Sequence, residues 1–218
     1  MKNFEVIKEQ FLDNKISWKN SLLNGISLDN NFNPIPWFCY PAISFLETKI
    51  KENQKIFEFG CGMSTLYFIN KNLKVFSLET NELWYNIMKP LQIRFCKKFL
   101  SDSLFYNAVN TDIDQKQKNE SRIFFIENPF DNDQYEKFIK NLNLKFDIIL
   151  IDSLKRFKCA VNAVDHINED GIIILDDSER KNYSKIFNFF NEKKFKNKTF
   201  SGIAPGQLKI KNTTFFYR

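Results

Sequence analysis

The chain has 218 residues, of which 43% are hydrophobic, and its formal net charge at pH 7 is +6. This length suffices for one large hydrophobic core and is short for two, so we expect a single domain over residues 1–218. No apolar run approaches the length of a membrane span, and the charged first residues contain no signal-peptide core. Four scattered cysteines and one histidine argue against a disulfide framework or a zinc site, and we expect a cytoplasmic protein.

The first 53 residues are predicted to form a helical, lid-like segment in front of the core. Apolar residues at helical spacing predict a helix over residues 3–15. The proline-rich stretch NPIPWFCYP follows and cannot be continuous helix, whereas residues 41–53 have helical spacing with a proline at the start. Trp37 and Tyr40 lie between these elements, where they would either cover a ligand or pack in the core.

Residues 54–218 alternate between strand and helix patterns, which predicts a Rossmann-like core. Apolar runs of strand length occupy residues 55–59, 74–79, 122–127, 146–152 and 171–176. Continuous apolar strands separated by helices are typical of a parallel sheet buried on both faces. Residues 198–204 and 209–217 are two strands joined by a Pro-Gly turn, which predicts an antiparallel hairpin at one edge. The fold class is therefore α/β, with a mostly parallel seven-stranded sheet. The polar stretch 111–121 is expected to be a loop.

The turn after the first of these strands reads EFGCG and is the main candidate for a ligand site. In open parallel sheets, ligands bind beyond the carboxyl ends of the strands. Gly60 and Gly62 permit a tight turn, but Thr65 occupies the place of the third glycine of a dinucleotide fingerprint. Glu58 precedes the turn and would repel a pyrophosphate. The pattern favours a ligand that has a cationic end and no phosphate.

These residues resemble the first-strand motif of class I S-adenosylmethionine-dependent methyltransferases, an acid followed by Gly-x-Gly. The resemblance covers residues 45–218 and implies a methyltransferase with S-adenosylmethionine as its cofactor. Glu79, at the end of the second strand, matches the acid that binds both ribose hydroxyls in that family, and two carboxylate oxygens suit two O–H donors. The resemblance implies as cofactor-binding residues Glu58, Gly60, Cys61, Gly62, Ser64, Thr65, Glu79, Glu127, Asn128 and Asp152, with Glu127 and Asn128 near the adenine.

A narrower resemblance concerns the substrate. The stretches PIPWFCYPAISFLE, FEFGCGMSTL, LDDSER and GIAP…TTFFYR are similar to a bacterial subgroup of small methyltransferase-like proteins found with surface-glycan genes. This similarity implies a small-molecule or glycan-precursor acceptor, O-methylation and a role in polysaccharide biosynthesis.

Residues after the fourth and fifth predicted strands are candidates for the chemistry. Asp152, Lys155 and Asp177 are the catalytic candidates, and Asp152, Asp176 and Asp177 are the candidate ligands of a divalent metal such as magnesium. Their layout resembles that of the divalent-metal-dependent O-methyltransferases, with Lys155 as the base and Asp177 in place of an asparagine.

Structural roles remain open for the same residues. Asp176 or Asp177 would alternatively cap a helix starting at Ser178, and Lys155 with Arg156 would grip an anionic substrate. His166, in a helix predicted over residues 158–168, is assigned a structural role, because it lies too far from the strand end to act as a base.

Other functions stay as alternatives: an S-adenosylmethionine-binding module without catalysis, and a NAD-dependent oxidoreductase. The dispersed lysines and the absence of an Asn-Pro-Pro-Tyr-type motif argue against a nucleic-acid partner. A homodimer is left open.

Overall fold

The computed structural model describes residues 2–100, 121–130 and 133–218. The helices in this part of the chain are α1 (Lys2–Asp13), α2 (Lys15–Asn24), α3 (Tyr40–Glu47), α4 (Met63–Asn70), α5 (Glu82–Leu100), α6 (Gln134–Asn141), α7 (Arg156–Ala163), α8 (Ser184–Glu192) and the short 3₁₀ helix η1 (Lys181–Tyr183). The strands are β1 (Lys55–Phe59), β2 (Lys74–Glu79), β3 (Arg122–Phe125), β4 (Phe146–Ile151), β5 (Ile167–Leu175), β6 (Lys196–Ile203) and β7 (Ile210–Tyr217). The predicted loop at 111–121 lies outside the described residues, apart from Ser121.

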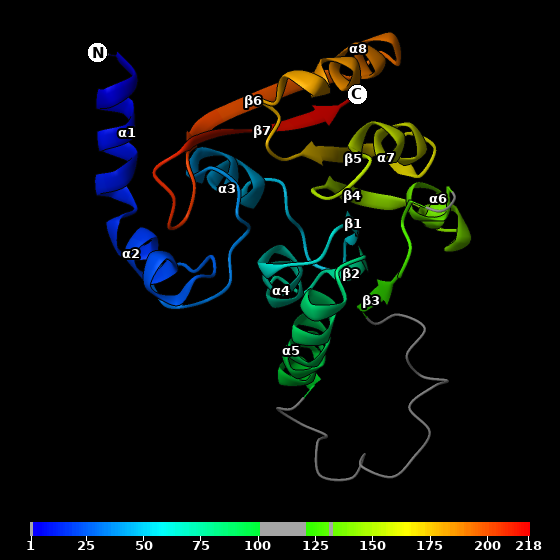
Figure 1. The fold of residues 1–218 in the computed structure, drawn as a ribbon, viewed down its shortest axis with the longest axis horizontal. Helices are drawn as coiled ribbons and strands as arrows, with labels where there is room; N and C mark the ends of the chain where they lie inside the picture. Colours follow the sequence, from blue (N-terminus) through cyan, green and yellow to red (C-terminus); the bar gives the residue numbers. More distant parts are fainter. Residues whose placement is uncertain (1, 101–120, 131–132) are drawn as a thin grey trace.

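The described strands form one seven-stranded sheet in the order β3-β2-β1-β4-β5-β7-β6 (Figure 1). Strands β1 to β5 pair in parallel, and β7 pairs antiparallel with both β5 and β6. The predicted mostly parallel sheet with a C-terminal antiparallel hairpin is therefore confirmed. The chain order reverses on either side of β1, and this is where such sheets place their ligands.

Neighbouring residues on the central strands face opposite sides of the sheet, and both sides are buried. Ile56 packs in a cluster with α3 and α4, whereas Phe57 packs in a cluster with α6, α7 and α8. The same alternation separates Phe215 from Phe216 on β7. Because side chains alternate with a period of two, a strand covered on both faces is apolar at most positions, and the fully buried Glu58 and Ser77 are exceptions that hydrogen-bond to each other. This explains the continuous apolar runs in the sequence.

The N-terminal residues form two helices where the sequence pattern predicted one. The expected helix over residues 3–15 ends at Asp13, and α2 follows it directly. Both helices are held by the hairpin: Gln10 Oε1 accepts from the Ile203 backbone N–H at 3.0 Å, and Trp18 Nε1 donates to the Gln207 carbonyl at 2.9 Å. Figure 1 shows α1 and α2 beside the turn that joins β6 to β7. Their position thus depends on contacts distant in sequence.

The predicted ends of two helices were wrong. The helix predicted over 41–53 ends at Glu47, where Thr48 Oγ1 donates to the Phe45 carbonyl at 2.7 Å. The helix predicted over 158–168 ends at Ala163, and His166 lies in the turn before β5. There its backbone carbonyl accepts from the Phe146 N–H at 2.9 Å, which starts the pairing of β4 with β5. The sheet register therefore overrides the helical pattern at this point.

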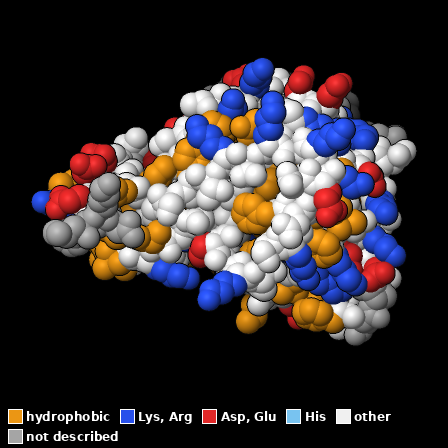
Figure 2. Space-filling model, turned by 90° about the horizontal axis from the view of Figure 1, so that it is seen from above, with side chains coloured by type: hydrophobic (Ala, Val, Ile, Leu, Met, Phe, Trp, Pro, Cys, Tyr) orange, Lys and Arg blue, Asp and Glu red, His pale blue; other side chains and the backbone are white. Residues whose placement is uncertain are grey.

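No helix among the described residues is both long and apolar enough to cross a membrane. On the face shown in Figure 2, Lys and Arg side chains form several separate groups, with acidic and apolar side chains between them. This arrangement agrees with the dispersed charge of the sequence.

Candidate functional site

The glycine turn lies at the carboxyl end of β1, where the expected site residues begin. Gly60 has a φ of +102°, and a Cβ added there would lie 2.9 Å from Ser153 Cβ. The turn therefore passes so close to the end of β4 that only glycine fits without strain. Gly62 is different, because its backbone is extended and a Cβ there would meet no atom within 4 Å. Open space thus adjoins Gly62, at the position where the resemblance places the cofactor.

Glu58, on β1, holds the glycine turn through hydrogen bonds. Its side chain is fully buried, and its Oε2 accepts from Thr65 Oγ1 and Ser77 Oγ, each at 2.6 Å. Thr65 Oγ1 in turn accepts from the Gly62 N–H at 3.0 Å, which ties the glycine turn to the first turn of α4. Burial raises the pKa of Glu58 to about 7, and hydrogen bonds from Ser77 and Thr65 oppose the shift. In this structure Glu58 acts on the turn through Thr65, and its direct contact with a cofactor stays a prediction.

Glu79, after β2, bridges the first two strand ends. Its Oε2 accepts from the Cys61 N–H at 3.1 Å and lies 3.4 Å from the Cys61 thiol, while its Oε1 accepts from the N–H groups of Thr80 and Asn81. The structure therefore brings together the two motifs that the sequence predicted to share one ligand. A carboxylate has about four acceptor sites, so Oε2 keeps capacity for a ligand hydroxyl in place of the weakly donating thiol.

The remaining predicted cofactor residues lie at the same edge of the sheet. Ser64 is half-buried in the first turn of α4. Glu127 and Asn128 follow β3 and are exposed. Since β3 pairs with β2 in parallel, both follow the strand end next to Glu79. Their contact with the adenine stays a prediction.

The three candidate metal ligands also come together. One carboxylate oxygen each from Asp152, Asp176 and Asp177 lies within 4.8 Å of the others, at the ends of β4 and β5. The alternative in which Asp176 or Asp177 caps a helix at Ser178 was wrong, because the next helical turns are η1 and α8. Asp177 instead adopts a left-handed backbone with a φ of +49°.

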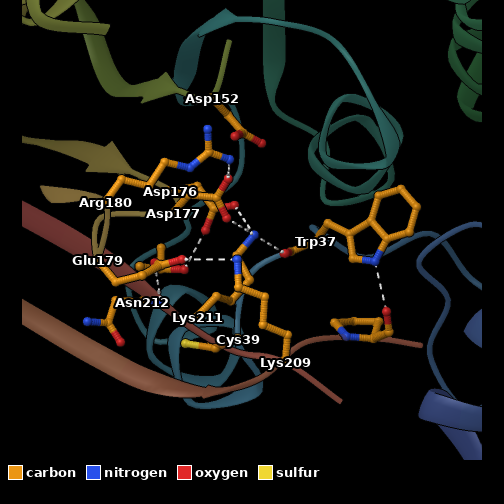
Figure 3. Close-up of polar contacts among 12 residues, drawn as sticks. Trp37, Cys39, Asp152, Asp176, Asp177, Glu179, Arg180, Lys209, Lys211 and Asn212 are labelled. Carbon is orange, nitrogen blue, oxygen red and sulfur yellow. Dashed lines mark hydrogen bonds and ion pairs between the residues drawn. The ribbon is translucent and has the colours of Figure 1, made fainter. Parts of the chain in front are cut away.

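Basic side chains of the chain itself occupy this acidic cluster (Figure 3). Lys211 Nζ lies 2.5 Å from Asp176 Oδ2 and 2.8 Å from Asp177 Oδ1. Arg156 NH2 lies 2.9 Å from Asp152 Oδ1, and Arg180 pairs with Asp177 Oδ2. Three carboxylates thus face three cations.

The charged side chains of this cluster shift one another's pKa values. Burial favours the neutral form of Lys211, but the negative charges of Asp176 and Asp152 outweigh it and raise the pKa of the ammonium group. Burial likewise acts to raise the pKa of Asp177, but Lys211 and Arg180 outweigh it and hold that pKa below its ordinary value. Lys211 and Asp177 are therefore held in their charged forms, whereas burial and the negative charge of Asp152 raise the pKa of Asp176 to about 7.

A divalent metal does not fit this cluster. Magnesium needs carboxylate oxygens with open coordination positions, and here an ammonium group already bonds oxygens of both Asp176 and Asp177. Asp176 Oδ1 accepts in addition from Thr213 Oγ1 at 2.6 Å. The metal expected from the resemblance is thus not supported.

The two basic candidates from the sequence, Lys155 and Arg156, are both bound by other groups of the protein. Lys155 Nζ forms an ion pair with Glu136 of α6 at 2.9 Å, and its base role stays a prediction. Arg156 is 7% exposed and also donates to the carbonyls of Ser153 and Asp176. A buried guanidinium bound in this way stabilises the strand ends and does not offer itself to an anionic substrate.

Sequence reasoning missed Lys211 and Ser77, and a sequence signal existed for Lys211. On β7 a period of two places Lys211 on the same side as Thr213 and Phe215, which are fully buried. A lysine at such a position requires an acidic partner. Ser77 pairs in register with Glu58 across β1 and β2, but only the structure shows which strands are neighbours.

No protein-family model and no curated protein matches the sequence, whereas solved structures match the fold. The O-methyltransferase TomG of Streptomyces achromogenes, solved with S-adenosylmethionine (SAM), aligns over 100% of this chain and 98% of its own, with a TM-score of 0.59 and 9% identity. A putative O-methyltransferase of Klebsiella pneumoniae aligns over 100% and 99%, with a TM-score of 0.59 and 12% identity. The precorrin-6y C5,15-methyltransferase of Geobacter metallireducens aligns over 80% and 87%, with a TM-score of 0.55 and 11% identity.

The chain has the methyltransferase fold. At these identities the similarity establishes the architecture, and activity, cofactor and acceptor must be argued from the residues of the site.

Proposed function

We propose that the protein transfers a methyl group from SAM to an oxygen of a small molecule, such as a sugar or glycan precursor. The observation that carries this proposal is the meeting of Glu79 with the glycine turn, where Glu79 Oε2 lies 3.1 Å from the Cys61 N–H. An acid beside a Gly-x-Gly turn, at the point where strand order reverses, combines a diol-binding carboxylate with backbone that a ligand can approach.

The proposed cofactor position follows from this geometry. The open space beside Gly62 would receive the amino-acid end, and Glu79 Oε2 would bind one ribose hydroxyl, because Glu79 Oε1 already accepts from two backbone N–H groups. Glu127 and Asn128 follow the neighbouring strand and would contact the adenine. When bound, SAM supplies the methyl group on a positively charged sulfur.

Asp152 is proposed to receive the proton of the acceptor hydroxyl. Asp152 is the first residue after β4. Its backbone N–H donates to the carbonyl of Phe59, the last residue of the neighbouring strand β1, at 3.1 Å. Its side chain is 34% exposed, against 1% for Asp176 and 18% for Asp177. Despite this exposure, desolvation by the protein atoms packed around the carboxyl group raises the pKa of Asp152, and Arg156 opposes the shift. A carboxylate with a raised pKa is a stronger base than an ordinary aspartate. Arg156 would hold this carboxylate in place.

Asp177 and Lys155, the other catalytic candidates, are given no direct part in the proton transfer of this proposal. Asp177 is bound by Lys211 and Arg180, and Lys155 by Glu136. The O-methyl choice draws on the likeness to O-methyltransferases, and the glycan-precursor choice on the resemblance of the sequence to the glycan-associated subgroup.

One specific observation favours a second candidate, a SAM-binding module without catalysis. Internal ion pairs satisfy most of the acidic cluster, which removes the metal chemistry that related layouts use. A NAD-dependent oxidoreductase is disfavoured, because the buried Thr65 side chain fills the place where a third glycine would let the helix pack closely.

Isothermal titration calorimetry with S-adenosylhomocysteine and with NAD tests the cofactor. The wild type should bind the first and not the second, and Glu79→Ala should bind it at least about tenfold more weakly, a loss of about 1.4 kcal/mol. Glu82→Ala is the matched control, because Glu82 is an exposed acid three residues later. Equal affinities of both variants and the wild type would refute the assignment of Glu79.

Turnover separates the two candidates. In a screen of hydroxylated acceptors with radiolabelled cofactor, the enzyme should methylate at least one acceptor, and Asp152→Asn should bind cofactor normally but lose that activity. Full activity of Asp152→Asn would remove Asp152 from the mechanism. Tight cofactor binding with no transfer to any acceptor would favour the non-catalytic module.

A further inference from the structure

The side chain of Lys211 lies at the centre of the acidic cluster, where a metal ion would be expected from the layout of the carboxylates. It comes from β7, whereas the carboxylates come from the ends of β4 and β5. Lys211 is 7% exposed, so its ammonium group has left water almost completely. Burying a charge in this way is costly unless it is paired and hydrogen-bonded.

All three N–H donors of the Lys211 ammonium group have acceptors. Nζ lies 2.5 Å from Asp176 Oδ2, 2.8 Å from Asp177 Oδ1 and 3.0 Å from the Trp37 carbonyl. An ammonium group has three donors and no acceptor, so this set leaves no capacity for a substrate. The contacts therefore point to a permanent structural cation and not to a substrate-binding lysine.

The cluster is balanced without any added ion. Asp152 faces Arg156, Asp177 faces Arg180 as well as Lys211, and Asp176 is bound by Lys211 and Thr213. A divalent cation at this place would have to displace Lys211 and would then face it as a like charge. In a largely buried site such repulsion costs more than a carboxylate contact returns.

We propose that Lys211 is a built-in cation that takes the place of a divalent metal between Asp176 and Asp177, so that this protein is metal-independent. The same ammonium group donates to the Trp37 carbonyl and so links the segment that carries Trp37 to the end of β5 and the start of β7. Trp37 is held on its other side too, because its Nε1 donates to the Pro205 carbonyl at 2.8 Å (Figure 3). Removal of Lys211 would leave a gap between Asp176 and Asp177 and would leave the charge of Asp176 unbalanced, which favours the binding of a hard cation there.

Direct metal titration tests this proposal independently of methyl transfer. Mn²⁺ is the probe, followed by electron paramagnetic resonance and by thermal denaturation of the full chain without cofactor. The wild type should show no saturable Mn²⁺ site, and neither Mn²⁺ nor EDTA should change its Tm. A saturable site in the wild type that Asp176→Asn removes would overturn the proposal.

Lys211→Ala should lower the Tm, gain a Mn²⁺ site at least about tenfold tighter than any binding to the wild type, and recover Tm when Mn²⁺ is added. Lys209→Ala is the control, because Lys209 is a 75% exposed lysine two residues away, and it should behave as the wild type. Lys211→Arg keeps the charge, so it should gain no saturable Mn²⁺ site and its Tm should not change when Mn²⁺ is added.

If Lys211→Ala does not fold, Mn²⁺ added during refolding should rescue it, and failure of that rescue counts against the proposal. A folded Lys211→Ala that has the wild-type Tm and no Mn²⁺ site also contradicts it. Because none of these readouts involves SAM, the proposal can fail while the proposed function stands, and the reverse also holds.

Discussion

The buried carboxylate of Glu58 makes a prediction about stability that can be worked out in detail. Its pKa is raised from an ordinary 4.5 to about 7 by burial. Between these values the folded chain keeps a proton that the unfolded chain releases, so the free energy of unfolding falls as pH rises. At about 1.4 kcal/mol per pKa unit, the loss above pH 7 is about 3 kcal/mol.

Glu58→Gln removes this titration. The glutamine carbonyl can still accept from Thr65 and Ser77, while its NH₂ group adds a cost of about 1–3 kcal/mol that does not depend on pH if it finds no acceptor. The free energy of unfolding of Glu58→Gln minus that of the wild type should therefore increase by about 3 kcal/mol between pH 4.5 and pH 8.

Urea denaturation at half-unit pH steps measures this difference, and Glu52→Gln serves as the control because Glu52 is exposed in the turn before β1. Other titrating groups cancel in the subtraction. A difference that stays constant from pH 4.5 to 8 would refute the reasoning, because Glu58 would then titrate alike in the folded and unfolded chains.

Three further predictions concern the glycine turn and the core. Gly60→Ala should lower the free energy of unfolding by about 1–3 kcal/mol in urea denaturation, because the added methyl meets Ser153, whereas Gly62→Ala should not; equal losses would contradict this. Calorimetry should show that Gly62→Ala binds S-adenosylhomocysteine more weakly, and unchanged affinity would place the ligand elsewhere. Phe190→Ala should cost about 3–5 kcal/mol in thermal denaturation, since the buried Phe190 ring stacks on Phe216 at 4.2 Å; a loss below about 1 kcal/mol would contradict close packing there.

Much of the sheet could be predicted from local pattern. The first two strands were predicted with their observed bounds, because runs buried on both faces are mainly apolar and are followed by polar or glycine residues. The hairpin was found from its Pro-Gly turn, where Gly206 adopts a φ of +70°. The helix α2 was missed, because its own sequence has no clear apolar face and polar contacts hold it in place, from Ser17 and Asn20 to residues 28–30 and from Trp18 to Gln207.

The candidate site likewise has features that follow from local sequence and features that follow from the tertiary structure. The sequence by itself determined the residue types at the strand ends, and the structure shows why one of them is glycine, because the turn at Gly60 passes close to the end of β4. Which side chains meet there was decided by tertiary structure: Lys211 enters from a strand that follows Asp176 by 35 residues and neutralises a cluster that resembled a metal site. Local sequence records the conformation and burial of each segment, whereas the charge balance of a site depends on strand order and register, which bring together residues distant along the chain.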